Sequence, residues 1–181
     1  MPRLDQFAPL LAALALSVFA LSASGCGYSS DSKEVVEGEV VELGDLKYQV
    51  IFSRFLNSSD NEDSAYLVGQ QPPPKGSTYF GVFLEVQNKS EETQKLAGSF
   101  KITDAGGQTF DAIPSESLYA FPVGGEVESQ EPIPLPDSTP QQGPIAGSLV
   151  LFQLPATASE NRPLILSIEA PGGPAEVTLD L

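Results

Sequence analysis

The chain has 181 residues, and its 24 acidic and nine basic side chains give a formal net charge of −15. A surface this acidic argues against nucleic acid as a partner, because phosphate backbones are bound by lysine and arginine. The chain has no histidine and a single cysteine, Cys26, which excludes Ser-His-Asp and Cys-His catalysis and the usual zinc and copper sites. Carboxylate chemistry, Ser–Lys pairs and cation binding by oxygen ligands remain available.

The N-terminus has the pattern of an export signal. Residues 10–21 form an apolar run of signal-peptide length that is short for a membrane span. Small residues follow, and the stretch LSASGC at 21–26 resembles the bacterial lipobox. This resemblance implies cleavage before Cys26 and a lipid on its thiol. Ala23 stands where the lipobox usually has leucine, so ordinary cleavage with a free thiol, and retention as an uncleaved anchor, remain alternatives.

This pattern divides the chain into three parts. We expect a lipoprotein signal peptide at residues 1–25, a flexible tether at 26–38 and one folded domain at 39–181. Two acyl chains on Cys26 are enough for stable membrane anchoring. The prediction places the domain on the extracytoplasmic side of the cell membrane, with the membrane as its partner through this lipid.

Alternation of apolar and polar residues predicts short strands throughout the domain. The clearest strand is 78–88, which we expect at the centre of a sheet, with one wholly apolar face and with Phe83 partly covered on the other. In the strand predicted at 46–55, Tyr48, Val50 and Phe52 are expected to share one face. Further strands are expected at 39–43, 99–103, 108–113, 147–155, 163–169 and 176–181.

Glycine- and proline-rich turns separate these strands, and no apolar run of helical period follows the signal. The pattern predicts an all-β fold, an antiparallel β-sandwich. Two segments interrupt it. Residues 70–76, with three consecutive prolines, cannot form a central strand. The long segment 122–147 is expected to lie over the sandwich, although its PIPLP stretch also fits a polyproline ligand for an aromatic groove.

The loop at 57–64 carries Asp60, Glu62 and Asp63, whose carboxylates are candidates for calcium binding. The loop lacks the spacing of an EF-hand, so a solvated loop is the alternative. Tyr66, Tyr79 and Phe83 are candidate contacts for a partner, with simple packing as the alternative.

Several stretches together resemble a known family: YFGVFLEVQNK at 79–89, SFKITDAGG at 99–107, GSLVLFQLP at 147–155 and PLIL at 163–166. They are similar to the immunoglobulin-like domain of unknown function found in Gram-positive, especially actinobacterial, lipoproteins. That domain is related in fold to a mycobacterial secreted immunoprotective antigen. The resemblance implies an immunoglobulin-like sandwich outside the cytoplasm, and it implies no catalytic residue, metal or cofactor.

We therefore expect a membrane-anchored, non-enzymatic binding or scaffolding module of the cell envelope, with an envelope protein or polymer as its partner. A calcium-binding acidic surface protein is one alternative. A glycan hydrolase is another, and it needs two carboxylates about 5–9.5 Å apart in a cleft. Nothing in the sequence around Glu85, Asp104 or Asp111 indicates such a pair.

Overall fold

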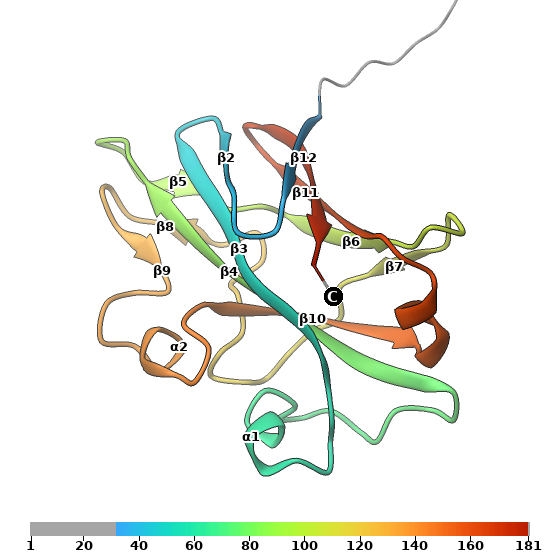
Figure 1. The fold of residues 1–181 in the computed structure, drawn as a ribbon. Helices are drawn as coiled ribbons and strands as arrows, with labels where there is room; N and C mark the ends of the chain where they lie inside the picture. The colour runs from blue at the N-terminus through green and yellow to red at the C-terminus, as the bar shows by residue number, and fades with distance from the viewer. Residues whose placement is uncertain (1–31, 181) are drawn as a thin grey trace, which may run out of the picture.

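The computed structural model describes residues 32–180, which form a mostly antiparallel β-sandwich (Figure 1). One sheet has the order β1–β12–β11–β6–β7, formed by Lys33–Val36, Gly173–Leu179, Leu164–Ala170, Ser99–Thr103 and Thr109–Asp111. The other has the order β10–β4–β3–β2, formed by Ser148–Pro155, Ser77–Asn88, Leu46–Leu56 and Val40–Leu43.

Smaller elements complete the fold. A short strand β9, Pro132–Ile133, pairs with the end of β4, while β5, Gln94–Lys95, and β8, Glu126–Val127, pair with each other. Two single-turn helices, α1 at Asn61–Ser64 and α2 at Thr139–Gln142, lie in the long loops, and a 3-10 helix, η1 at Ala156–Glu160, follows β10. The predicted all-β sandwich and the strands at 39–43, 46–55, 78–88, 99–103, 147–155 and 163–169 are confirmed within a few residues.

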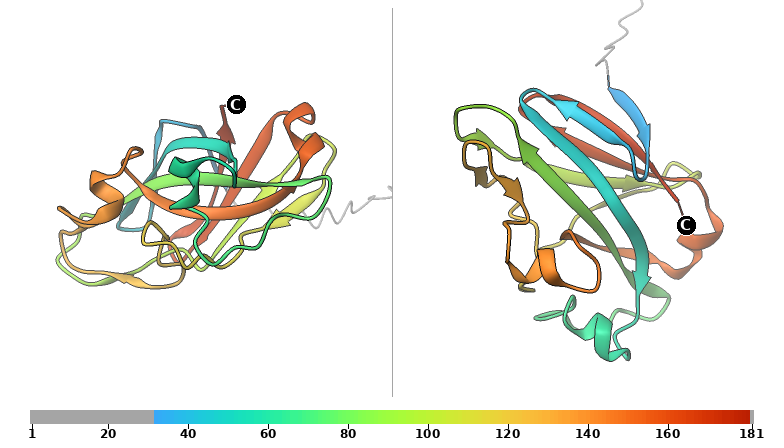
Figure 2. Two further views of the ribbon diagram at one scale, coloured as in Figure 1. Left: turned by 90° about the horizontal axis from the view of Figure 1, so that it is seen from below. Right: turned by 60° about the vertical axis from the view of Figure 1, so that its left-hand side comes forward.

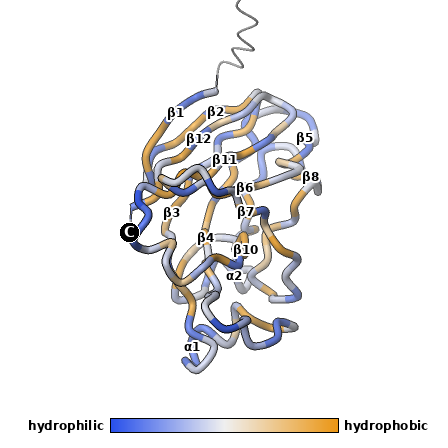
Figure 3. The backbone as a smooth tube through the Cα atoms, turned by 90° about the vertical axis from the view of Figure 1, so that its right-hand side faces the viewer, coloured by the Kyte–Doolittle hydropathy of each residue, from blue (hydrophilic) through white to orange (hydrophobic). Residues whose placement is uncertain are grey.

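The main core lies between the two sheets, where apolar side chains of both are withdrawn from water. The predicted inward face of β4 is confirmed, because Phe80, Val82, Leu84 and Val86 are all fully buried. Figure 2 shows the two layers from the side, and Figure 3 shows hydrophobic residues concentrated along the strands. The central place of β4 is also confirmed, since it lies between β10 and β3.

Strand β3 contains a bulge that the alternation did not predict. Val50 lies opposite Leu84 and Phe52 lies opposite the next residue of β4, Phe83, so Ile51 is an extra residue. An extra residue exchanges the two faces of everything that follows it. Phe52 therefore lies on the outer face, 42% exposed, and its prediction alongside Tyr48 and Val50 is wrong.

The folded region begins earlier than predicted. Lys33–Val36, expected in the flexible tether, is strand β1 and pairs in parallel with Ala175–Thr178 of β12. Val35 packs against the main core. The Glu37 carboxylate accepts hydrogen bonds from Ser53 N at 3.1 Å, Ser53 Oγ at 2.5 Å and Asp180 N at 3.2 Å. The tether boundary at residue 38 is therefore wrong, because packing of Val35 and capping by Glu37 fix this segment.

Within residues 32–180 no helix has the length and apolar character needed to cross a membrane.

Ionisation of Tyr48 is expected to destabilise the fold at high pH. Burial raises the pKa of its phenol to about 12, and its oxygen accepts a hydrogen bond from Ala97 N at 2.9 Å. A phenol with a raised pKa in the folded state stabilises the fold fully below its unfolded pKa of about 10, and this stability is lost as pH rises toward about 12. We expect the melting temperature to fall between about pH 10 and 12. The ultraviolet absorbance of the deprotonated Tyr48 phenol should appear only toward the upper end of this interval.

The matched variant for this test is Tyr48→Phe, which lacks the ionisable group. Its melting temperature should decline less steeply between about pH 10 and 12 than that of the unmodified protein. Identical pH profiles for the two proteins would contradict the assignment.

Candidate binding groove

A groove of about 560 Å³ lies on the side of the sandwich where β7 and β10 are the edge strands of their sheets. Its volume falls within the usual range for ligand pockets, about 300–1,000 Å³. It is lined by Gly98, Ser99, Phe100, Asp111, Ala112, Ile113, Pro114, Ser115, Ala120, Phe121, Val123, Leu149, Val150 and Leu151. We call this feature the edge groove.

One wall of the edge groove is the segment that leaves β7 and crosses to the other sheet. Ala112 N donates to Phe100 O of β6 at 3.0 Å, and the next amide, Ile113 N, donates to Leu151 O of β10 at 2.8 Å. Two consecutive residues therefore connect the two sheets at this side of the sandwich. The backbone cannot stay extended in one sheet and satisfy both bonds, so the wall is held between the layers.

The opposite wall is the return of the same segment. Phe121 N donates to Leu149 O at 2.8 Å, and Leu149 N donates to Tyr119 O at 2.7 Å. Between the two crossings the chain passes over the outer face of the β10–β4–β3 sheet, where Ser117 Oγ donates to Ala65 O at 2.7 Å, and Leu118 is 78% exposed. These backbone bonds hold both walls in place with an opening between them.

The floor of the edge groove is apolar and the rim is polar. The rings of Phe100 and Phe121 pack edge to face with centroids 5.3 Å apart. Ser99 and Asp111 lie on the rim, and the Asp111 carboxylate is 3.6 Å from Lys101 Nζ. At one end Val123 remains half exposed. An apolar floor inside a polar rim suits the burial of an apolar ligand group or side chain.

The space around Gly98, at the entrance of the edge groove, is open. A Cβ added to this residue would have no atom within 4 Å, and its backbone conformation is open to any residue. Gly98 N donates to Glu169 O at 2.9 Å, which holds the position against β11. A larger side chain at residue 98 would project into free space at the groove without strain.

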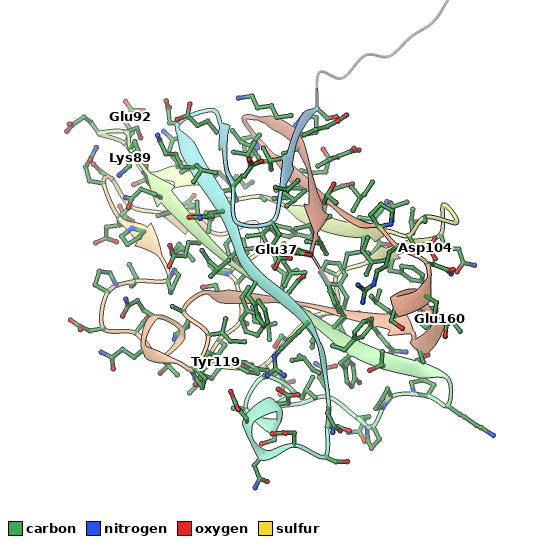
Figure 4. All side chains as sticks on the ribbon, in the orientation of Figure 1. Glu37, Lys89, Glu92, Asp104, Tyr119 and Glu160 are labelled. Atoms are coloured by element: carbon green, nitrogen blue, oxygen red, sulfur yellow. The ribbon has the colours of Figure 1, made fainter. Side chains whose placement is uncertain are left out.

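The aromatic residues predicted to contact a partner lie elsewhere. Tyr66, Tyr79 and Phe83 are 1%, 4% and 0% exposed and form a second core on the outer face of the β10–β4–β3 sheet. Tyr66 packs edge to face on Phe83 at 4.9 Å and on Tyr119 at 4.7 Å. Tyr119 is labelled in Figure 4. The loops at 57–76 and 112–147 cover these rings. Their prediction as surface contacts is therefore wrong, and the packing alternative holds.

The acidic loop does not form a calcium site. Asp60 caps α1, its Oδ1 accepting a hydrogen bond from Glu62 N at 2.8 Å. The Asp63 carboxylate is 2% exposed, forms an ion pair with Arg54 and accepts a hydrogen bond from Asn57 N at 2.7 Å. Asp60 and Asp63 are engaged in capping and in the ion pair, and the structure does not bring the three carboxylates together as the calcium prediction requires. Residues 32–180 contain no group of three or more metal-ligating side chains.

The remaining candidates are spread over the molecule. Asp104 caps the β6–β7 turn, its Oδ1 accepting from Gln108 N at 2.9 Å. Asp111 lies on the edge groove, and Glu85 lies in a different pocket on the outer face of β4. The structure does not bring these three carboxylates together. Cys26, the predicted lipidation site, lies outside the described residues.

The residues of the edge groove share no pattern in the sequence. Ile113 closes a predicted strand, and Phe121 and Val123 lie in or beside a segment without strand alternation. Their common feature is proximity to β10, some 30 residues further along the chain. The local sequence signal is two apolar residues, Phe121 and Val123, in a segment without strand alternation, and isolated apolar residues of this kind are common.

No protein-family model and no curated protein matches the chain. Among solved structures, an uncharacterized β-sandwich protein from Clostridium difficile 630 is similar at 15% identity and a TM-score of 0.50, covering 82% of this chain and 95% of that one. This similarity shows the β-sandwich fold and does not show a family. The resemblance to actinobacterial lipoproteins and to the mycobacterial antigen is not established by it.

Two further structures match at lower TM-scores. The yjhA protein from Bacillus subtilis has 13% identity and a TM-score of 0.44, covering 82% of this chain and 99% of that one. A provisionally assigned lipoprotein (ycdA) from Bacillus subtilis subsp. subtilis str. 168 has 7% identity and a TM-score of 0.47, covering 80% of this chain and 38% of that one.

The Arg54–Asp63 pair should be structural, which a substitution can test. Arg54→Met leaves the Asp63 carboxylate buried without its cation, and breaking a buried pair costs about 3–5 kcal/mol. Since the Arg54 side chain is 30% exposed, we expect a loss near the lower end of that range. The measurement is the free energy of unfolding in urea.

Lys101→Met is the matched control, because it breaks the exposed Lys101–Asp111 pair on the other side of the molecule. Exposed pairs contribute about 0–1 kcal/mol. Equal losses in the two variants would show that Asp63 does not depend on Arg54.

Proposed function

We propose that this protein is a lipid-anchored, extracytoplasmic binding module of the cell envelope, and that its edge groove takes an extended apolar segment of an envelope protein. The observation that carries the proposal is the groove itself, with an apolar floor, a polar rim and a position between two edge strands. The β10 edge beside the groove is already hydrogen-bonded to Ile113, Tyr119 and Phe121, so the partner segment is held by burial of its apolar side chains in the groove and not by strand pairing.

The composition of the edge groove supports binding rather than catalysis. Its lining is apolar or hydroxylated except for Asp111, whose carboxylate lies 3.6 Å from Lys101 Nζ. The Asp111 carboxylate lies on the rim, where its ion pair with Lys101 fixes its position, and it can accept a hydrogen bond from a polar group of the partner. Burial of the partner's apolar side chains against the floor is the main favourable contribution to binding, and it has to exceed the entropy lost when the two proteins associate.

The anchoring half of the proposal rests on the N-terminal sequence. The apolar run at 10–21, the small residues at 22–25 and Cys26 together match a lipoprotein signal. The acidic domain, which would be repelled from anionic lipid, fits attachment through a lipid at one end of the chain and not through its surface.

Replacing Cys26 with alanine tests the anchor. We expect Cys26→Ala to move the protein from the membrane fraction to the extracellular medium, because the acceptor of both acyl chains is removed. Ser24→Ala, which keeps a small residue in the signal, is the control and should fractionate as the unmodified protein does. Unchanged membrane fractionation of Cys26→Ala would overturn this part of the proposal.

Photo-crosslinking tests the edge groove. A photoreactive side chain at Ser99 on the rim should crosslink one defined envelope protein in intact cells, and the same group at Thr178, exposed on β12, should not. Adding Val123→Glu should reduce the Ser99 adduct about tenfold or more, because a charge must then be buried against the apolar segment.

Leu118→Glu is the matched control for Val123→Glu. It lies in the same segment, is 78% exposed and does not line the edge groove. This control variant should leave the adduct intact. Equal yields from Ser99 and Thr178, or an adduct that Val123→Glu leaves unchanged, would rule out the edge groove as the binding site.

A further inference from the structure

A second pocket, of about 420 Å³, lies on the outer face of the β10–β4–β3–β2 sheet, away from the edge groove. Its floor contains two cross-strand pairs of polar residues, Gln49 opposite Glu85 and Lys47 opposite Gln87, with the exposed Val40 of β2 beside Gln49. Side chains of directly opposed residues lie side by side on one face of a sheet. We call this feature the polar pocket.

The wall of the polar pocket comes from the proline-rich part of the long 122–147 segment. Pro132, Pro134 and Pro136 line it, with Ile133 between them and Gln141 of α2 beyond. This wall therefore offers aliphatic ring surfaces that face amide and carboxylate groups of the floor.

The wall is held firmly at its start. Ile133 pairs with Val86 and Pro132 pairs with Gln87, so strand β9 extends the sheet. The fully buried Asn88 donates from Nδ2 to Glu128 O at 2.9 Å and to Glu92 O at 2.7 Å. Lys89, the next residue, lies at the rim of the pocket at the end of β4 (Figure 4). The space is therefore part of an ordered structure.

The two ends of the same sheet face differ in a way that points to a ligand. At one end Tyr79 and Phe83 are apolar, and the loops pack directly on them in the second core. At the other end Glu85 and Gln87 are polar, and the loop stands over them with a space left between. A loop that serves packing alone covers apolar surface. Here the proline-rich wall stands over polar residues, so the hydrogen-bonding groups of the floor face the space of the pocket, where a ligand can reach them.

The floor groups retain hydrogen-bonding capacity. The Glu85 carboxylate is half-buried and makes no hydrogen bond or ion pair with any residue from 32 to 180. Gln49 donates to Gly38 O at 2.8 Å, which leaves its carbonyl oxygen available. Lys47 pairs with Glu42 at 2.7 Å, just outside the pocket. The pocket therefore contains both hydrogen-bond acceptors and hydrogen-bond donors. Two of the few lysines of this strongly acidic protein, Lys47 and Lys89, line it.

We propose that the polar pocket binds a saccharide. A sugar ring is chemically two-sided, with hydroxyl groups that bond to amides, carboxylates and ammonium groups, and with C–H surfaces that pack on aliphatic rings. The floor supplies the first kind of group through the side-chain oxygens of Gln49, Glu85 and Gln87, since Gln87 Nε2 already donates to Gln130 O at 3.2 Å, and the prolines supply the second. This site is separate from the edge groove and adds a glycan of the envelope as a second binding partner.

Binding of soluble oligosaccharides to the purified full-length protein tests the proposal. The probes are the tetramer of N-acetylglucosamine and maltotetraose, with the free monosaccharides alongside, and the measurement is titration calorimetry. We expect at least one tetramer to bind. A tetramer that binds more tightly than its monosaccharide indicates a glycan chain as the natural ligand, and equal affinities indicate a free sugar.

Substitutions locate the binding. Glu85→Ala and Gln49→Ala should each weaken it about tenfold or more, since each removes a hydrogen-bonding partner in the floor. Gln153→Ala is the matched control, because Gln153 lies on the same sheet face opposite Tyr79 and outside the pocket, and it should leave the affinity unchanged. Thermal melting of each variant confirms folding, and Glu85→Met, which keeps the length of the side chain and removes both acceptor oxygens, replaces Glu85→Ala if the latter unfolds.

The outcomes separate this inference from the proposed function. Val123→Glu, which blocks the edge groove, should leave saccharide affinity unchanged. Absence of binding by every probe, or binding that Glu85 and Gln49 variants do not weaken, overturns the polar pocket as a saccharide site, whatever the crosslinking at Ser99 shows.

Discussion

Burial of both faces of β4 along its first half is the constraint on which the rest of the structure depends. Phe80 and Val82 face the main core, while Tyr79 and Phe83 face the opposite side. Each such side chain contributes about 1.5–3 kcal/mol when withdrawn from water. The second sheet covers one face, and the loops at 57–76 and 112–147 have to cover the other. The loop segment at 112–147, which covers this outer face, also lines the edge groove and the polar pocket.

The bulge at Ile51 lets β3 satisfy the same constraint. Before it, Tyr48 and Val50 contribute to the main core, and after it Leu56 contributes to the second core beside Tyr79. A strand without the extra residue would direct the same side chains to one face throughout. Gly81 of β4 helps here, since a Cβ at that position would lie 3.0 Å from the side chain of Leu149. The second core can therefore approach β4 closely.

The sequence predicts the architecture well because strand alternation and turns are local properties. It predicts the inward face of β4 and the position of that strand within its sheet for the same reason. It does not predict β1, since KEVV is short and charged and becomes a strand only beside β12, at the other end of the chain. It misassigns Tyr66 and Asp63 because their burial depends on where two loops fold. The edge groove lies between residues joined only by tertiary structure, so alternation could not reveal it.

The parallel pairing of β1 with β12 has a mechanical consequence. Lys33 to Val36 lie beside Ala175 to Thr178 in matching order, and the chain enters the sandwich at the start of β1 (Figure 1). A pull on that end, resisted by the body of the domain, runs along the strand axis. The inter-strand hydrogen bonds are then loaded in shear, all at once, and do not open one after another. Val35 and the Glu37 cap add to the resistance, so the entry point of the chain is reinforced against tension.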